Sequence, residues 1–117
     1  MEHQVWVTEA ELLLGVDCDR EVEIGGAVAD GHFLSDGCTF AIEVDNAAKQ
    51  SRRQYLEKWN KYGRFDGFIL VVCHSDKRME SLSRWAEPQK EVCLFSTFER
   101  LRAGEPWIDG YGNKAAI

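Results

Sequence analysis

The stretch "VADGHFLSDGCTFAIEVDNAAK", residues 28–49, decides the predicted fold of this chain. It contains two runs of apolar residues separated by Asp36-Gly37, and Asp-Gly is a preferred sequence for a two-residue β-turn. Such a turn pairs Ser35 with Cys38, and every other cross-strand pair then follows from this one. The stretch therefore predicts a β-hairpin whose register is fixed at the turn.

The two faces of this hairpin differ in charge. In the predicted register Asp30 lies opposite Glu43, and Asp45 shares their face because alternate residues of a strand point to the same side. The opposite face is apolar and carries Ala29, Phe33, Phe40, Ile42 and Val44. Like charges directly opposed across a hairpin destabilise it, so a cation is expected beside them. A basic side chain from the following segment or a divalent ion would meet this need, and a fully solvated acidic face is the third alternative.

A basic segment follows the hairpin. Between positions 47 and 64 there are six lysines and arginines and one glutamate, which gives this segment a net charge of +5. Because the whole chain carries −6, the residues outside this segment carry −11. Apolar residues repeat there at helical spacing and Gly63 follows, which predicts a helix over 47–62. Its basic side chains suit the phosphates of DNA. The alternative is an ordinary amphipathic helix with solvated charges. The residues predicted to contact DNA are Lys49, Arg52, Arg53 and Lys58.

The remaining segments predict an α/β fold. A capping-box pattern begins at Thr8 and predicts a helix ending at Gly15, and alternation predicts a strand over 20–24. Further along, an apolar run predicts a strand covered on both faces at 66–73, followed by a helix at 75–86, a strand at 91–96 and a helical turn at 97–104. Long helical crossovers between the later strands require part of the sheet to be parallel.

Length and composition predict one domain. The chain has 117 residues and 44% hydrophobic side chains, enough for one core and too few for two ordinary domains. No apolar run is long enough to cross a bilayer, and the start of the sequence has no export signal, so neither a membrane partner nor secretion is expected. The four cysteines form no Cys-x-x-Cys pair, which favours reduced thiols in a cytoplasmic protein.

The arrangement of Asp30, the hairpin, Glu43-Val44-Asp45 and a basic helix containing Lys58 and Tyr62 resembles a known family. It is similar to the PD-(D/E)XK restriction-endonuclease-like superfamily, and within it to the replication-relaxation family of plasmid and mobile-element proteins. The resemblance covers residues 21–72 and implies a restriction-endonuclease-like mixed sheet flanked by helices. It also implies a DNA-binding protein of plasmid or mobile-element replication and maintenance.

The resemblance implies a metal-dependent DNA endonuclease site as well. The family's metal ligands correspond to Asp30 and Glu43, with Asp45 as a third carboxylate beside them, and the expected ion is Mg²⁺ or Mn²⁺. Asp45 stands where a nuclease carries the lysine that stabilises developing negative charge. Lys49, four residues further on, is the predicted substitute for that lysine. The predicted catalytic residues are therefore Asp30, Glu43 and Lys49.

Two other functions stay open from the sequence. The first is a catalytically inactive relative that binds DNA or a protein partner through the same basic helix. The second is a small regulatory module whose acidic surface docks on a basic partner. The replication-relaxation resemblance also raises the expectation that residues 1–117 are one endonuclease-like domain of a longer protein with an upstream DNA-binding domain. The sequence leaves the oligomeric state open.

Overall fold

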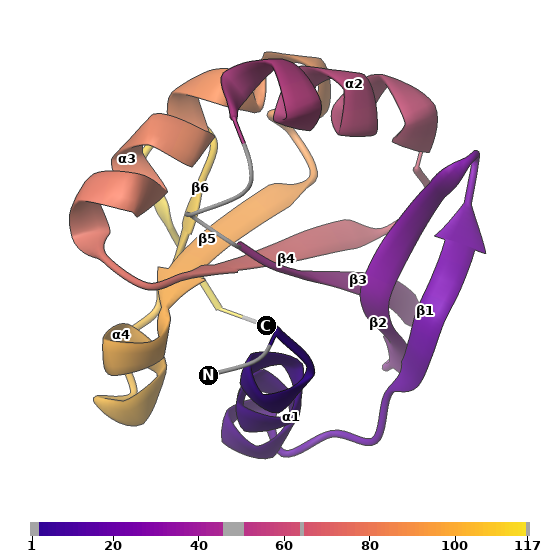
Figure 1. Cartoon of the computed structure of the whole chain (residues 1–117). Coiled ribbons are helices and arrows are strands. Elements are labelled where there is room, and N and C mark those ends of the chain that lie inside the picture. Colours follow the sequence, from indigo (N-terminus) through magenta and orange to yellow (C-terminus); the bar gives the residue numbers. More distant parts are fainter. Residues whose placement is uncertain (1–2, 46–50, 64, 117) are drawn as a thin grey trace.

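A seven-stranded mixed sheet runs through the computed structural model, which describes residues 3–45, 51–63 and 65–116, and helices cover both of its faces (Figure 1). The spatial order of the strands follows the chain. The strands are β1 (Asp19–Ile24), β2 (Ala27–Ser35), β3 (Cys38–Val44), β4 (Phe68–Cys73), β5 (Cys93–Thr97), β6 (Trp107–Asp109) and β7 (Lys114–Ala115). The helices are α1 (His3–Leu14), α2 (Arg52–Tyr62), α3 (Asp76–Trp85) and α4 (Phe98–Arg102), with a 3₁₀ turn η1 (Glu87–Gln89).

The centre of the sheet is parallel and its two sides are antiparallel. Strand β4 pairs in parallel with β3 and with β5, whereas β1–β2–β3 and β5–β6–β7 are antiparallel. Helix α2 connects β3 to β4, and α3 with η1 connects β4 to β5; both helices lie on one face of the sheet (Figure 1). The predicted α/β class and the partly parallel sheet are confirmed.

Strand β4 shows how the sequence builds two cores. Its residues Ile69, Val71 and Cys73 belong to the apolar cluster under α2 and α3. The alternate residues Leu70 and Val72 belong to the cluster under α1 and α4. A strand covered on both faces must be apolar at every position, which explains the uninterrupted run FILVVC.

The hairpin has the predicted register. Ser35 pairs with Cys38 and Phe33 with Phe40, and the last recorded pair is Gly31 with Ile42. The turn residue Asp36 has a φ of 50°. Two-residue hairpin turns need such positive values, and aspartate tolerates them better than most residues do.

Strand β2 changes face near Asp30. Ala29 belongs to the cluster under α2, whereas Phe33 belongs to the cluster under α1. In β1, Glu21 lies opposite Asp30, because Arg20 pairs with Gly31 on one side of it and Val22 with Ala29 on the other. Glu21 has a φ of 50°. The prediction that Ala29 shares a face with Phe33 is therefore wrong, because the backbone at this position departs from regular alternation.

Helix boundaries differ from the predictions at two places. Helix α1 begins at His3, and Thr8 lies inside it, where its hydroxyl donates to the carbonyl of Gln4 instead of capping a helix start. Helix α2 begins at Arg52, because Ser51 is its N-cap and forms a capping box with Gln54. The preceding part of the predicted helix, 47–50, lies outside the described residues.

The chain also continues past the last predicted element. After α4, strands β6 and β7 form a hairpin on the outer side of β5. The Asp109 carboxylate accepts the backbone N–H groups of Tyr111 and Asn113 at 2.9 Å each and so closes the turn. Within the described residues no helix is long and apolar enough to cross a membrane.

Candidate functional site

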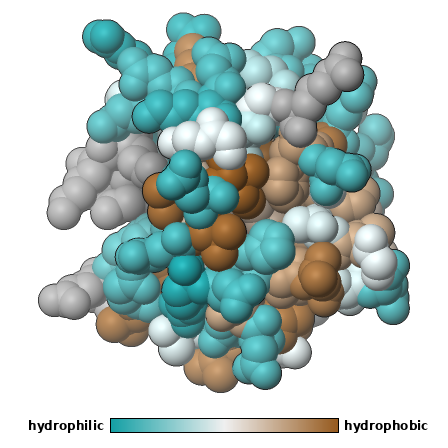
Figure 2. Space-filling view, turned by 90° about the vertical axis from the view of Figure 1, so that its right-hand side faces the viewer, coloured by the Kyte–Doolittle hydropathy of each residue, from teal (hydrophilic) through white to brown (hydrophobic). Residues whose placement is uncertain are grey.

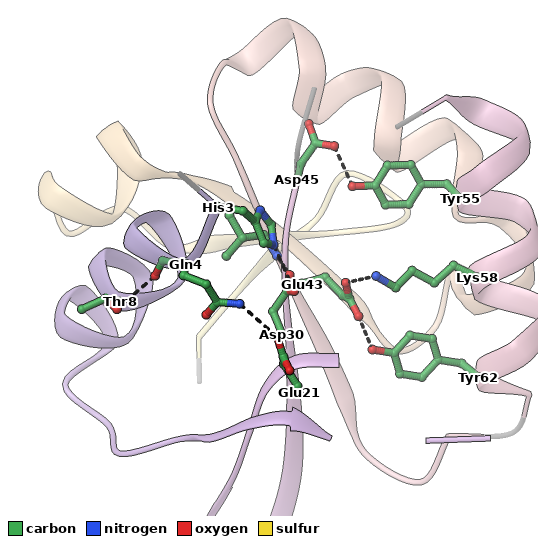
Figure 3. A network of polar contacts seen from close by, with 11 residues as sticks. His3, Gln4, Thr8, Glu21, Asp30, Glu43, Asp45, Tyr55, Lys58 and Tyr62 are labelled. Atoms are coloured by element: carbon green, nitrogen blue, oxygen red, sulfur yellow. Dashed lines mark hydrogen bonds and ion pairs between the residues drawn. The ribbon is translucent and has the colours of Figure 1, made fainter. Parts of the chain in front are cut away.

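Glu43 lies at the centre of the first polar cluster. Its side chain is 2% exposed and projects from β3 towards α2 (Figure 3). Lys58 Nζ lies 2.5 Å from Glu43 Oε2, and the Tyr62 hydroxyl donates to Oε1. Lys58 and Tyr62 are four residues apart on α2, a spacing that brings both side chains to one face of the helix. We call this group the Glu43 centre.

Asp45 forms a second cluster directly after β3. Its side chain is 0% exposed and accepts the Tyr55 hydroxyl at 2.6 Å (Figure 3). Arg78 of α3 binds both carboxylate oxygens, through Nε at 2.7 Å and through Nη2 at 3.1 Å. The guanidinium carbon also lies 5.9 Å from the Tyr55 ring centroid and 5.2 Å from that of Trp85. We call this group the Asp45 centre.

These two clusters correct one alternative from the sequence. A fully solvated acidic face is wrong for Glu43 and Asp45, because the side of β3 that carries them is covered by α2 and α3. A buried carboxylate requires charged or hydrogen-bonding partners, and each receives one cation and one tyrosine. The expectation that the basic helix offsets these acids is confirmed for Glu43 by Lys58.

Asp30 contacts different partners from Glu43. Its Oδ2 accepts the backbone N–H of Val44 at 2.8 Å, and its Oδ1 lies 3.0 Å from His3 Nε2 of α1 (Figure 3). The contact to Val44 lies just beyond the last recorded backbone pair of β2 and β3, Gly31 with Ile42. Asp30 therefore links β2 and α1 to β3 where regular strand pairing ends.

The electrostatics of the Glu43 centre follow from burial. Burial raises the pKa of Glu43 to about 7; the positive charge of Lys58 opposes this shift, and the negative charge of Asp30 adds to it. Burial and the neighbouring Glu43 carboxylate also raise the pKa of Tyr62, so its hydroxyl remains a hydrogen-bond donor. In the Asp45 centre, the hydrogen bond to Asp45 raises the pKa of Arg78.

The three predicted metal ligands do not fit a divalent ion in this arrangement. Both oxygens of Asp30, Glu43 and Asp45 are engaged by protein donors, and two of the donors are the cations Lys58 and Arg78. Among the described residues no group of three or more His, Cys, Asp or Glu side chains could hold a metal ion. Mg²⁺ needs carboxylate oxygens that are directed at a common point and room for its waters.

The solvent side of α2 lies next to the Glu43 centre. Arg52, Arg53 and Lys61 are exposed, and hydrophilic surface covers the top of the molecule in Figure 2, where α2 lies in Figure 1. A groove of about 280 Å³ separates α2 from the β1–β2 turn. It is lined by Gly26, Ala27, Val28, Gln54, Glu57, Lys58 and Lys61. Lys58 therefore connects the buried Glu43 carboxylate with this open groove.

The structure brings only some of the predicted site residues together. Glu43 and Lys58 are in contact, Arg52 and Arg53 lie on the exposed side of the same helix, and Lys49 lies outside the described residues. The sequence reasoning did not assign His3 and Arg78 as partners of Asp30 and Asp45. His3 is 27 positions from Asp30, and Arg78 is 33 positions from Asp45, so no local sequence pattern predicts these contacts.

Comparison of the chain with protein-family models, with curated proteins and with solved structures found no significant match.

Proposed function

We propose that the protein binds DNA through the solvent side of α2 and the adjoining groove. We include in this proposal the restriction-endonuclease-like fold, a role in plasmid or mobile-element replication and maintenance, and a cytoplasmic location. The observation that carries it is that Arg52, Arg53 and Lys61 are exposed on a helix whose fourth cation, Lys58, lines the groove. All four cysteines are free thiols, which supports the cytoplasmic part.

The contact surface suits phosphates rather than bases. Lysine and arginine side chains along one helix neutralise consecutive phosphates, and this contribution to affinity is independent of sequence and sensitive to salt. Arg53 is paired with Glu57 at 3.3 Å, but its side chain is 89% exposed, so a phosphate can reach it. Since the whole chain carries a net charge of −6, binding must depend on this local surface.

Charge reversal on α2 tests the proposal. The variant Arg52→Glu/Arg53→Glu is compared with Lys77→Glu/Arg84→Glu, which makes the same charge change at exposed positions of α3. Binding of fluorescein-labelled duplex and single-stranded DNA is followed by anisotropy at several salt concentrations. We expect the α2 variant to bind every sequence at least about tenfold more weakly, and the α3 variant to change far less. Equal losses in both variants would place the contact surface elsewhere.

Metal-dependent cleavage, which the resemblance implies, stays a prediction. Its assay is cleavage of single-stranded, double-stranded and branched DNA by the wild type and by Glu43→Gln, with Mg²⁺ or Mn²⁺ present. A nuclease loses cleavage in the variant while it remains folded, since removing one electrostatic catalytic group costs about 10²- to 10³-fold in rate. If the wild type binds DNA but cuts none of these substrates, the result supports the alternative of a catalytically inactive relative that binds DNA. If it binds no DNA, the protein-binding module is the remaining alternative.

A further inference from the structure

The Glu43 centre already contains a cation. The Lys58 ammonium lies 2.5 Å from Glu43 Oε2, and its side chain is 20% exposed while Glu43 is 2% exposed. Lys58 also lines the groove on α2, so its side chain connects the buried carboxylate to the open surface. The other oxygen of Glu43 accepts the Tyr62 hydroxyl. One helix therefore provides a donor to each oxygen of this carboxylate.

Asp30 uses its oxygens in a similar way. One accepts the backbone N–H of Val44, and the other lies 3.0 Å from His3 Nε2. These contacts hold β2 and α1 to β3, so Asp30 cannot turn towards an ion without releasing one of them. The two acids that the resemblance assigns to a divalent ion are thus both engaged by the protein itself.

Charge balance points the same way. A buried carboxylate needs one neighbouring positive charge, and Lys58 provides it. A divalent ion bound to Glu43 would have to lie beside the Lys58 ammonium or displace it. Two like charges at contact distance repel strongly, and Mg²⁺ also keeps several water molecules that need space.

We infer that Lys58 is the resident cation of the Glu43 centre: its ammonium closes the Glu43 carboxylate to Mg²⁺ and Mn²⁺, and removing it opens that carboxylate. The inference is independent of DNA binding, because it concerns the charge balance of the folded chain alone. It also gives Lys58 a role different from that predicted for Lys49. Lys58 replaces the ion instead of assisting it.

The test measures Mn²⁺ binding by isothermal titration calorimetry and by the electron paramagnetic resonance signal of free Mn²⁺. Wild type is compared with Lys58→Met and with Lys61→Met, which removes the same charge from an exposed position three residues further along α2. The variant Lys58→Met/Glu43→Gln serves as the second control, since it lacks both charges. We expect Lys58→Met to bind Mn²⁺ at least about tenfold more tightly than wild type and Lys61→Met, and the double variant to lose this gain.

Several outcomes would overturn the inference. If wild type binds Mn²⁺ as tightly as Lys58→Met does, and if Glu43→Gln abolishes this binding, then the Glu43 centre admits the ion beside Lys58. A folded Lys58→Met that gains no affinity would show that the ammonium was not the obstacle. Because Lys58→Met removes the cation beside a buried carboxylate, its thermal unfolding is also followed with and without Mn²⁺. The ion should raise its Tm but not that of the double variant, and equal responses would contradict the proposal.

Discussion

Glu43 in β3 and Asp45 directly after it are two residues apart, yet their surroundings differ. Both carboxylates are buried, and each accepts a hydroxyl from a tyrosine of α2. Asp45 is held by two hydrogen bonds from Arg78, which lies next to two aromatic rings. Glu43 accepts a single recorded bond from Lys58, whose side chain also lines a groove.

The two centres differ in how rigidly the cation holds the carboxylate. The Asp45 centre joins β3, α2 and α3 through a planar guanidinium whose fork matches a carboxylate, so its geometry is fixed. The Glu43 centre joins β3 to α2 alone through a flexible lysine stem. We therefore expect the Asp45 centre to contribute more to the stability of the fold than the Glu43 centre.

The largest effect is expected from Arg78→Met. The substitution leaves the fully buried Asp45 without its cation, which costs about 3–5 kcal/mol of unfolding free energy. Urea denaturation followed by circular dichroism measures the loss. Arg84→Met removes an exposed arginine from the same helix and should change stability by less than about 0.5 kcal/mol. Equal effects of the two variants would remove the structural role given to Arg78.

A smaller effect is expected from Lys58→Met. The loss should be about 1–3 kcal/mol at neutral pH, because burial raises the pKa of Glu43 to about 7 and the carboxylate can take up a proton when Lys58 is absent. The same denaturation experiment measures it. A loss greater than that of Arg78→Met would reverse the comparison between the two centres.

The pH dependence of stability sharpens the comparison further. In the folded chain the pKa of Glu43 is about 7, above its ordinary value of 4.5. Between these two pH values the folded chain therefore binds more protons than the unfolded chain. The stabilisation from this group is therefore complete below pH 4.5 and is lost as the pH rises through about 7, with a slope of at most about 1.4 kcal/mol per pH unit. Glu43→Gln should remove this part of the slope, as urea denaturation across the range will show. An identical slope in wild type and variant would mean that another group causes it.

The smallest effects are expected from the two tyrosines. Tyr55→Phe and Tyr62→Phe each remove one hydroxyl donor to a buried carboxylate, at a cost of about 1–2 kcal/mol. Tyr62→Phe should also raise the pKa of Glu43, because the Tyr62 hydrogen bond favours the charged carboxylate. Carbon-13 NMR of the labelled glutamate side chains measures that change. An unchanged pKa would contradict the contact.

The sequence was sufficient for features that depend on local pattern. The Asp36-Gly37 turn determined the hairpin register, and the helix predicted over 75–86 is α3, with Ser75 as its N-cap, because capping depends on neighbouring residues. Apolar residues at helical spacing predicted a helix where α2 lies, and its Tyr55, Trp59 and Tyr62 are buried. Helix α1 was predicted too short because the capping-box pattern at Thr8 also occurs within helices.

Other features depend on contacts that no local pattern specifies. Asp45 is paired with Arg78, 33 positions away, and Asp30 with His3, 27 positions away. The burial of Glu43 could not be predicted either, because an acidic residue in an alternating strand normally faces solvent. Strand β2 changes the face to which its side chains point near Asp30, where Glu21 of the paired strand β1 has a φ of 50°. A prediction based on strict two-residue alternation cannot include such an irregularity.

Two double-mutant cycles test the central claim most directly. One combines Asp45→Asn with Arg78→Met, the other Glu43→Gln with Lys58→Met, and each coupling free energy is obtained from urea denaturation at pH 5 and at pH 8. We predict the larger coupling for Asp45 and Arg78 at both pH values. For Glu43 and Lys58 we predict a smaller coupling that diminishes at pH 5, where Glu43 is protonated. A Glu43–Lys58 coupling that matches that of Asp45–Arg78 and stays constant between the two pH values would contradict the account.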